Sequence, residues 1–116
     1  MLKKIVAAFL PPVILRVADF SITPGGRYMR DAHIYGDHNA EAYRKKVLLP
    51  LLVEGRNVVM HFDGTCGIPS AWLNEVFAHP DTRMYVNSIK FATKGYSRIY
   101  DKICVQFLYG KRPYQG

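Results

Sequence analysis

A short apolar run at residues 57–62, followed by a loop and then by helical spacing, constrains the fold more than any other feature of this chain. The run has the sequence Asn-Val-Val-Met-His-Phe and is bounded by turn-forming residues. Short apolar runs between turn signals are typical of strands that are buried on both faces of a sheet. We therefore predict that residues 57–62 form a central strand.

A helix is predicted directly after the loop at residues 63–69. Ser70 opens this helix, and Pro80 with Asp81 is expected to end it. Its apolar residues recur at the spacing of one helix face. They are Trp72, Leu73, Val76 and Phe77. We expect this face to pack on the sheet.

Another helix is expected earlier in the chain, where Asp37 or Asn39 could cap its first turn. Its apolar residues follow helical spacing, with the basic residues 44–46 mostly on the opposite face. Pro50 is expected to kink this helix or to lie in its last turn. Gly55 fits the position just after the helix end.

The remaining segments predict further strands and one more helix. Residues 4–9 and 13–18 are apolar and partly β-branched, and two adjacent prolines separate them. Residues 84–91 also predict a strand, whereas residues 21–36 are rich in turn formers and predict an irregular connection. Near the end of the chain, helical spacing and strand alternation fit equally well, and we favour a helix through 97–104.

Alternating strands and helices indicate one α/β domain over residues 1–116, with a sheet partly covered by helices. A chain of 116 residues fits a single domain, and an apolar content of 49% is too high for a disordered chain. The formal charge of +7 favours acidic partners and permits contact with nucleic acid, although the basic residues are spread along the chain.

The start of the chain resembles a secretion signal only in part. Two lysines precede a short apolar run, but two prolines interrupt it and no small-residue cleavage motif follows. The run is also too short to span a bilayer. We therefore expect a cytoplasmic protein that makes no membrane contact, with Cys66 and Cys104 as reduced thiols.

The loop and helix start at residues 63–75 form the first candidate site. Sites in open α/β sheets lie at the carboxyl ends of strands, and this junction follows the predicted central strand. A helix start would favour a negative charge, such as a phosphate, on Ser70. The alternative is that Ser70 only caps the helix. The candidate partner-binding residues here are Asp63, Gly64, Thr65, Gly67, Ser70 and Trp72.

The second candidate site is the turn at residues 23–28. Its paired glycines could form a backbone nest for an anion, which Arg27 could support beside Tyr28. The alternative is a simple turn, because Pro-Gly-Gly runs often form one. The chain contains no glycine motif of the nucleotide-binding type.

Catalytic patterns in the sequence are weak. Cys66 lies five residues after His61, but no third residue that would orient a Cys–His pair is evident. The histidines and cysteines do not have the spacing of metal ligands. We therefore predict no catalysis and no metal or other cofactor. An enzyme that uses Cys66 or Ser70 is the least favoured alternative.

Three segments, taken in order, resemble one known family. Residues 20–28 resemble the opening motif of the STAS-like DUF4325 domain, with the sequence Phe-Ser-Ile-Thr-Pro-Gly-Gly-Arg-Tyr. Residues 43–50 resemble its basic Leu-Leu-Pro helix, and residues 58–77 resemble its strand, Asp-Gly turn and Ser-led helix. The resemblance is strongest over residues 20–77 and fades beyond Arg83.

This resemblance implies a fold and a mode of action. We expect a STAS-like mixed sheet of about four to five strands, with helices packed mainly on one face. STAS domains such as anti-anti-sigma factors bind a histidine-kinase-like ATPase, which phosphorylates a Ser or Thr at the start of the helix after a central strand. Ser70 is the matching position. The resemblance therefore implies a regulatory protein-binding module with Ser70 as its phosphoacceptor.

An alternative is a basic accessory protein, from a phage or mobile element, that binds nucleic acid or inhibits a host nucleic-acid machine such as a defence system. The charge of +7, the basic residues 44–46 and the aromatic residues between Tyr96 and Tyr114 favour it. Binding through phosphates weakens steeply as salt is added, and this separates the alternative from a protein-binding regulator.

Overall fold

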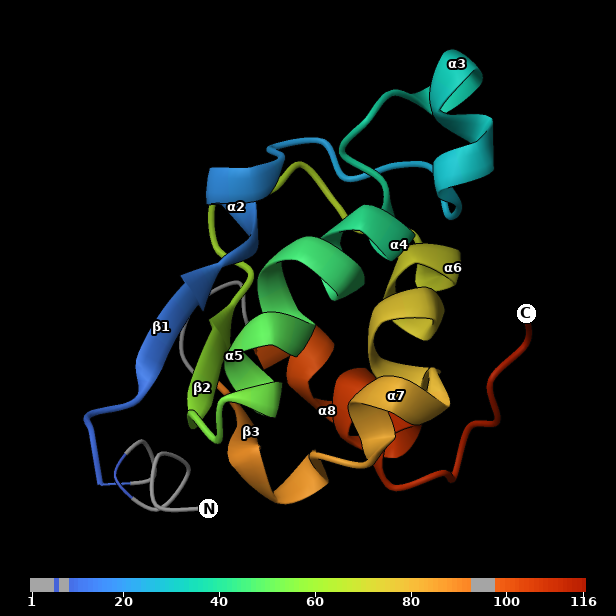
Figure 1. Cartoon of the computed structure of the whole chain (residues 1–116). Coiled ribbons are helices and arrows are strands. Elements are labelled where there is room, and N and C mark those ends of the chain that lie inside the picture. The colour runs from blue at the N-terminus through green and yellow to red at the C-terminus, as the bar shows by residue number, and fades with distance from the viewer. Residues whose placement is uncertain (1–5, 7–8, 93–97) are drawn as a thin grey trace.

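The structure is a computed structural model that describes residues 6, 9–92 and 98–116 (Figure 1). Within these residues, three parallel strands form one sheet in the order β1-β2-β3. They are β1 (Val13–Arg16), β2 (Val58–His61) and β3 (Ile89–Phe91). Val58 pairs with Val13 on one side and with Ile89 on the other. The prediction of a central strand at 57–62 is therefore confirmed.

The expected mixed sheet of about four to five strands is wrong for the described residues, because their sheet is wholly parallel and smaller. In the predicted strand at 84–91, only β3 pairs with β2. The residues before it form the 3₁₀ turn η4 (Val86–Ser88), in which Ser88 N–H donates to Tyr85 O at 2.9 Å. Asn and Ser favour such turns because their short polar side chains compete with strand pairing.

The amino-terminal strand is shorter than predicted. β1 ends at Arg16, and the next residues turn into helix α2 (Val17–Phe20). β1 lies at the edge of the sheet, and its Ile14 is half exposed. The predicted strand at 4–9 lies almost wholly outside the described residues, and Val6, which is described, is exposed.

The connection at residues 21–36 is less irregular than predicted. It contains the 3₁₀ turn η1 (Met29–Asp31) and the short helix α3 (Ala32–Tyr35). The turn formers before η1 stay irregular, as expected.

The first crossover runs from β1 to β2 through α4 (Ala40–Tyr43), the π-helical turn η2 (Arg44–Leu48) and α5 (Leu49–Val53). Asn39 caps the helix as predicted, since its side chain accepts a hydrogen bond from Ala42 N. Pro50 has no N–H to donate and would clash with the preceding turn of a regular helix. The wider π turn lies directly before it. Gly55, at φ 89°, ends the helix as expected.

The second crossover begins with α6 (Ser70–Leu73) and the π-helical turn η3 (Asn74–Ala78). The predicted apolar face is confirmed, because Trp72, Leu73, Val76 and Phe77 are all buried. Pro80 does more than end this helix. It is the first residue of a further helix, α7 (Pro80–Arg83), where a missing N–H costs nothing.

The end of the chain is helical, as favoured from the sequence. Helix α8 (Arg98–Leu108) extends beyond the predicted range, and residue 97 lies outside the described part. Cys104, Phe107 and Leu108 are buried in the same core as the face of α6 and η3. Cys66 is exposed and Cys104 is buried, and the two do not form a disulfide.

Figure 1 shows helices α4 to α8 gathered on one side of the three strands. Both crossovers move in the same direction along the sheet, and such connections are right-handed, so both place their helices on the same face. Burial agrees, because Val58 and Met60 are buried while Val59 and His61 between them are only half-buried. No helix in the described part of the chain has the length and apolar content that crossing a membrane requires.

Candidate functional site

The loop at residues 63–69 leaves the carboxyl end of β2 and forms an exposed junction with α6. Gly64 and Gly67 both have positive φ, at 90° and 112°, which L side chains rarely adopt. Thr65 Oγ1 donates to Phe62 O at 2.9 Å. Cys66 N–H donates to Ile22 O at 2.7 Å, so the junction is tied to the connection that follows β1. We call residues 63–70 the junction surface.

Ser70 lies at the end of this surface and is exposed. It is the first helical residue, and Pro69 holds the capping position in an extended conformation. Among the described residues, no side-chain hydrogen bond caps this helix. The structure therefore does not support the alternative that Ser70 caps the helix, because Pro69 holds the position from which a capping side chain normally comes.

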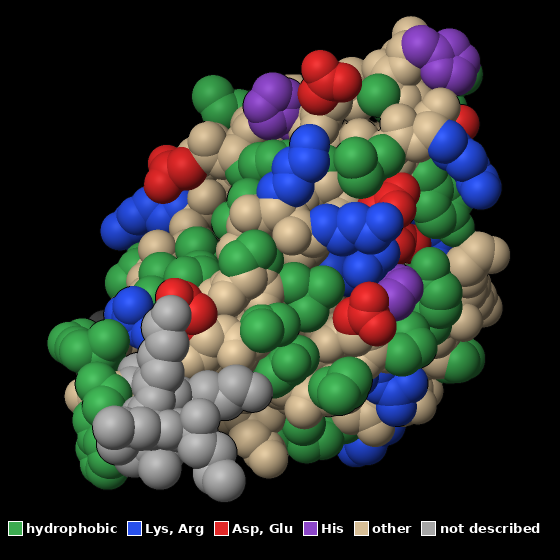
Figure 2. Space-filling model, in the orientation of Figure 1, with side chains coloured by type: hydrophobic (Ala, Val, Ile, Leu, Met, Phe, Trp, Pro, Cys, Tyr) green, Lys and Arg blue, Asp and Glu red, His purple; other side chains and the backbone are tan. Residues whose placement is uncertain are grey.

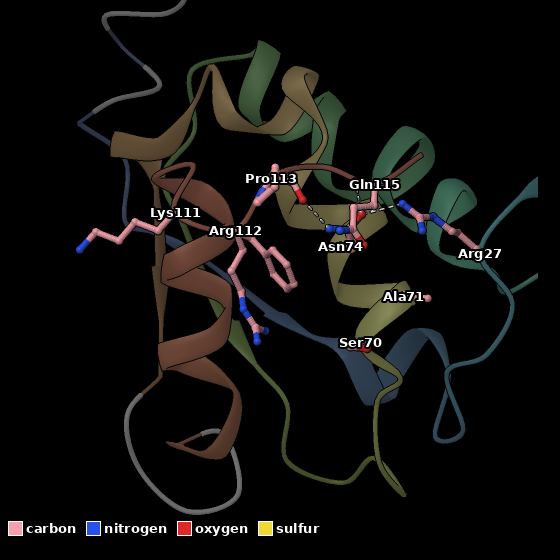
Figure 3. A pocket seen from close by; sticks show the side chains of 9 residues that line it. Arg27, Ser70, Ala71, Asn74, Lys111, Arg112, Pro113 and Gln115 are labelled. Carbon is pink, nitrogen blue, oxygen red and sulfur yellow. Dashed lines mark hydrogen bonds between the residues drawn. The ribbon is translucent and has the colours of Figure 1, made fainter.

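A cavity of about 410 Å³ opens beside Ser70 (Figure 3). We call it the cationic cavity, because the charged residues among its described lining are all basic. Its lining residues are Arg27, Ser70, Ala71, Asn74, Phe107, Lys111, Arg112, Pro113 and Gln115. Figure 3 places Arg27 and Arg112 on opposite sides, with Ser70 between them. The side chain of Lys111 points away.

One helical turn beyond Ser70, a buried carboxylate collects three polar partners. Glu75 is 1% exposed. Arg27 Nε lies 3.1 Å from Glu75 Oε1, and Arg44 Nη2 lies 3.0 Å from Glu75 Oε2. The hydroxyl of Tyr114 donates to Glu75 Oε1 at 2.8 Å. Burying a carboxylate is costly unless it is paired and hydrogen-bonded, and here both oxygens have charged partners.

A second cavity of about 550 Å³, which we call the mixed-charge cavity, has Tyr114 in its lining. Figure 2 shows basic, acidic and histidine side chains together over the region between α4 and α7. The cavity is lined by Tyr28, Met29, Arg30, Glu41, Arg44, Lys45, Glu75, His79, Asp81 and Tyr114. The segment 111–115 therefore contributes to both cavities, because Tyr114 lines this one and its other four residues line the cationic cavity.

The pKa values of two groups in this region, Tyr114 and His79, are shifted in the direction that favours the neutral form. Burial, followed by the hydrogen bond to Glu75, raises the pKa of Tyr114 to about 12. Burial also lowers the pKa of His79, and the charge of Arg44 lowers it further. Neutral His79 fits its geometry, because its Nδ1 accepts a hydrogen bond from Asp81 N–H at 3.1 Å.

The structure divides the predicted site residues into four groups. Four of them lie together in the loop after β2, where Asp63 and Gly64 are exposed and Thr65 and Gly67 are half-buried. Arg27 and Ser70 line the same cavity, although 43 positions separate them in the chain. Tyr28 lines the mixed-charge cavity and lies under the guanidinium of Arg30, with 4.3 Å from Arg30 Cζ to the ring centroid. Trp72 is 1% exposed and packs against Tyr43, so its prediction as a partner-binding residue is wrong.

The glycine turn at 23–28 is docked on the start of α4. Gly26 O accepts from Ala40 N–H at 3.1 Å, and Arg27 O accepts from Glu41 N–H at 2.9 Å. These carbonyls satisfy amides that a helix start leaves without intrahelical partners. The geometry favours the simple turn over the anion nest, and Arg27 instead directs its side chain to Glu75.

Sequence reasoning missed Arg44 and Tyr114 as members of a site, and it singled out neither Asn74 nor Glu75 within the candidate range 63–75. Arg44 was expected on the exposed helix face, but it is 2% exposed. Both Arg44 and the pair Asn74–Glu75 lie in π-helical turns, which rotate side chains away from the positions of a regular helix. Helical periodicity therefore cannot place them.

The described residues contain no group of three or more His, Cys, Asp or Glu side chains that could hold a metal ion. Comparison with protein-family models, with curated proteins and with solved structures finds no match to this chain. The resemblance to the STAS-like family therefore stays a prediction, and the function has to be inferred from the site.

Proposed function

We propose that this chain is a small regulatory module of the STAS-like type, which binds a protein partner through the junction surface. In this proposal an ATPase-type kinase phosphorylates Ser70, and the phosphate weakens binding of the partner. The chain itself catalyses no reaction. The supporting observation is the position of Ser70. Its exposed side chain lies at a helix start, beside a cavity whose described charged residues are Arg27, Lys111 and Arg112.

A phosphate would change this surface strongly while leaving the fold intact. It adds about −1.5 to −2 charges and three strong acceptor oxygens at neutral pH. A helix start stabilises such a charge by about 0.3–1 kcal/mol. Arg112 lies across the cavity and could donate charge-assisted hydrogen bonds to it. A partner shaped for a neutral hydroxyl would instead meet a dianion that it has to desolvate.

The test uses three full-length variants as bait in lysate of the native host, with quantitative mass spectrometry. Ser70→Asp mimics the charge, and Ser70→Ala removes the hydroxyl. Asn87→Asp adds the same charge at the exposed turn η4, before the amino end of β3 and therefore at the opposite end of the parallel sheet. We expect the parent, Ser70→Ala and Asn87→Asp to retain a common partner that Ser70→Asp loses by tenfold or more, which corresponds to about 1.4 kcal/mol.

If Ser70→Asp and the parent recover equal amounts of the partner, the proposal that a negative charge at Ser70 weakens partner binding is contradicted. Phosphopeptide mapping after incubation with ATP and the captured partner checks the chemistry separately. Phosphate on Ser70 is expected. Phosphate only at other residues would contradict Ser70 as the phosphoacceptor.

The structure weakens two arguments for the nucleic-acid alternative. Arg44 is buried against Glu75, and Lys45 Nζ lies 2.8 Å from Glu41 Oε2. In the aromatic end segment, Tyr100 and Phe107 are buried in the core, and Tyr96 lies outside the described residues. We therefore expect any binding of duplex DNA or RNA to be weak. Tight binding that falls steeply with salt would favour the alternative.

A further inference from the structure

Residues 113–115 are held on helix residue Asn74 through their backbone. Asn74 Nδ2 donates to Pro113 O at 3.2 Å, and Asn74 Oδ1 accepts from Gln115 N–H at 3.0 Å. A side-chain amide that pairs with one carbonyl and with the N–H two residues later binds an extended backbone as a neighbouring strand would. Such a contact does not depend on the side chains of the bound segment.

The residue between these two backbone contacts, Tyr114, is bound through its side chain. Its hydroxyl donates to Glu75, and its ring lies 5.4 Å from Arg27 Cζ and 5.0 Å from the His79 ring centroid. Glu75 is fixed by two arginines, so its carboxylate is oriented before the tyrosine arrives. This arrangement selects an aromatic side chain that ends in a hydrogen-bond donor.

The segment itself is held mainly by these polar contacts. Its other residues from 111 to 116 are exposed, and Tyr114 is only half-buried. Residues of this segment line both the cavity of about 410 Å³ and the cavity of about 550 Å³, so the segment does not fill the surface on which it lies. The polar groups beneath it could accept another segment of the same chemistry.

We propose that Asn74, Glu75, Arg27 and His79 form a binding site for an extended peptide of a partner protein, centred on an unmodified tyrosine. Residues 113–115 occupy this site in cis and compete with the partner. The inference goes beyond the proposed switch, because none of these contacts involves Ser70 and the proposed ligand is a peptide with an unmodified tyrosine.

The experiment measures binding of a labelled peptide, Lys-Arg-Pro-Tyr-Gln-Gly, to the full chain by fluorescence anisotropy. Tyr114→Ala removes the anchor of the cis segment and leaves all four site residues in place. A tethered competitor at an effective concentration of order millimolar weakens binding of a free peptide with a Kd of about 0.1 mM by about tenfold, so we expect Tyr114→Ala to bind the peptide about tenfold more tightly than the parent. Adding Asn74→Ala to this variant should abolish the gain.

Two modified peptides test the selectivity of the site. A peptide with Phe in place of Tyr lacks the donor for Glu75 and should bind Tyr114→Ala about tenfold more weakly than the tyrosine peptide. A phosphotyrosine peptide faces the Glu75 carboxylate with negative charge and should also bind more weakly. Tighter binding of the phosphotyrosine peptide would overturn the proposal.

Intrinsic fluorescence of buried Trp72 reports whether each variant is folded. If Tyr114→Ala unfolds, Tyr114→Phe keeps the ring and is used instead, and a smaller gain in peptide affinity over the parent is still expected. No gain with a folded variant, or a gain that Asn74→Ala does not remove, would overturn the proposal. Dimerisation of the parent that Asn74→Ala abolishes would also overturn it, because the occupant would then be a second copy of this chain.

Discussion

At the scale of single residues, the central feature of the site is the buried carboxylate of Glu75, which is paired with Arg27 and Arg44. A buried carboxylate with two arginines contributes little net stability compared with apolar residues of the same volume, because desolvating the charges is costly. Removing one partner is different, since it leaves an uncompensated charge in the interior. Glu75 therefore fixes the positions of Arg27 and Arg44 more than it stabilises the fold.

We expect Glu75→Gln to lower the free energy of unfolding by roughly 3–5 kcal/mol, because Arg44 would remain buried without its carboxylate. The matched control is Asp81→Asn, which removes the other carboxylate near Arg44. The Asp81 side chain is 56% exposed and lies 3.5 Å from Arg44 Nη1, so its loss should cost about 0–1 kcal/mol. Urea denaturation measures both values. A similar small loss of unfolding free energy for the two variants would show that Arg44 does not depend on Glu75 as its buried charge partner.

The raised pKa of Tyr114 makes part of the stability depend on alkaline pH. An unfolded tyrosine loses its proton near pH 10, at about its ordinary pKa. Folded Tyr114, with a pKa of about 12, keeps it, so its contribution is complete below pH 10 and is lost as pH rises toward 12. We expect the unfolding free energy of the parent to fall more steeply above about pH 10 than that of Tyr114→Phe. Burial also raises the pKa of Tyr43, but Tyr43 is present in both chains and does not affect the difference between them. Parallel curves would contradict the prediction.

At the scale of elements, the two crossover helices begin in different ways. Asn39 caps α4 with its own side chain, whereas α6 begins after Pro69 without a side-chain cap from the described residues. Pro69 supplies the fixed backbone angle of the helix entry, and Ser70 is left with an exposed hydroxyl. Under the proposed switch, this difference leaves the Ser70 hydroxyl accessible to the kinase.

The two helix starts predict different costs for the same truncation. Asn39→Ala removes the acceptor of Ala42 N–H and should cost about 0.5–2 kcal/mol. Ser70→Ala removes no capping bond and should change the unfolding free energy by less than about 0.5 kcal/mol. Thermal or chemical denaturation of both variants checks this. An equal loss would show that Ser70 caps α6 after all.

The elements also show how far the sequence predicts this structure. Local sequence patterns predict the central strand, the buried face at residues 72–77, the helix cap at Asn39 and the helix end at Gly55, because each depends on neighbours within a few residues. The π turns are not signalled by a regular period, so Glu75 is not expected inside. Its contact with Tyr114 joins residues 39 positions apart and depends on how α8 packs, which local patterns do not encode.

At the scale of the whole molecule, the parallel sheet brings several candidate segments to one end. The junction surface leaves the carboxyl end of β2, and its Cys66 contacts the connection that leaves β1. Helix α6 and residues 111–115 complete the walls of the cationic cavity. The amino ends of β2 and β3, with η4, lie at the opposite end of the sheet. A partner that uses the junction surface should therefore leave that opposite end free.

Hydrogen exchange of the chain, alone and with its captured partner, locates the partner on the molecule. We expect the partner to slow exchange in residues 63–74 and 22–30, and to leave residues 86–90 unchanged. Phosphorylated or Ser70→Asp chain should show no such protection at the same partner concentration. Protection confined to residues 86–90, or unaltered by a charge at Ser70, would contradict the assignment of the junction surface as the regulated partner site.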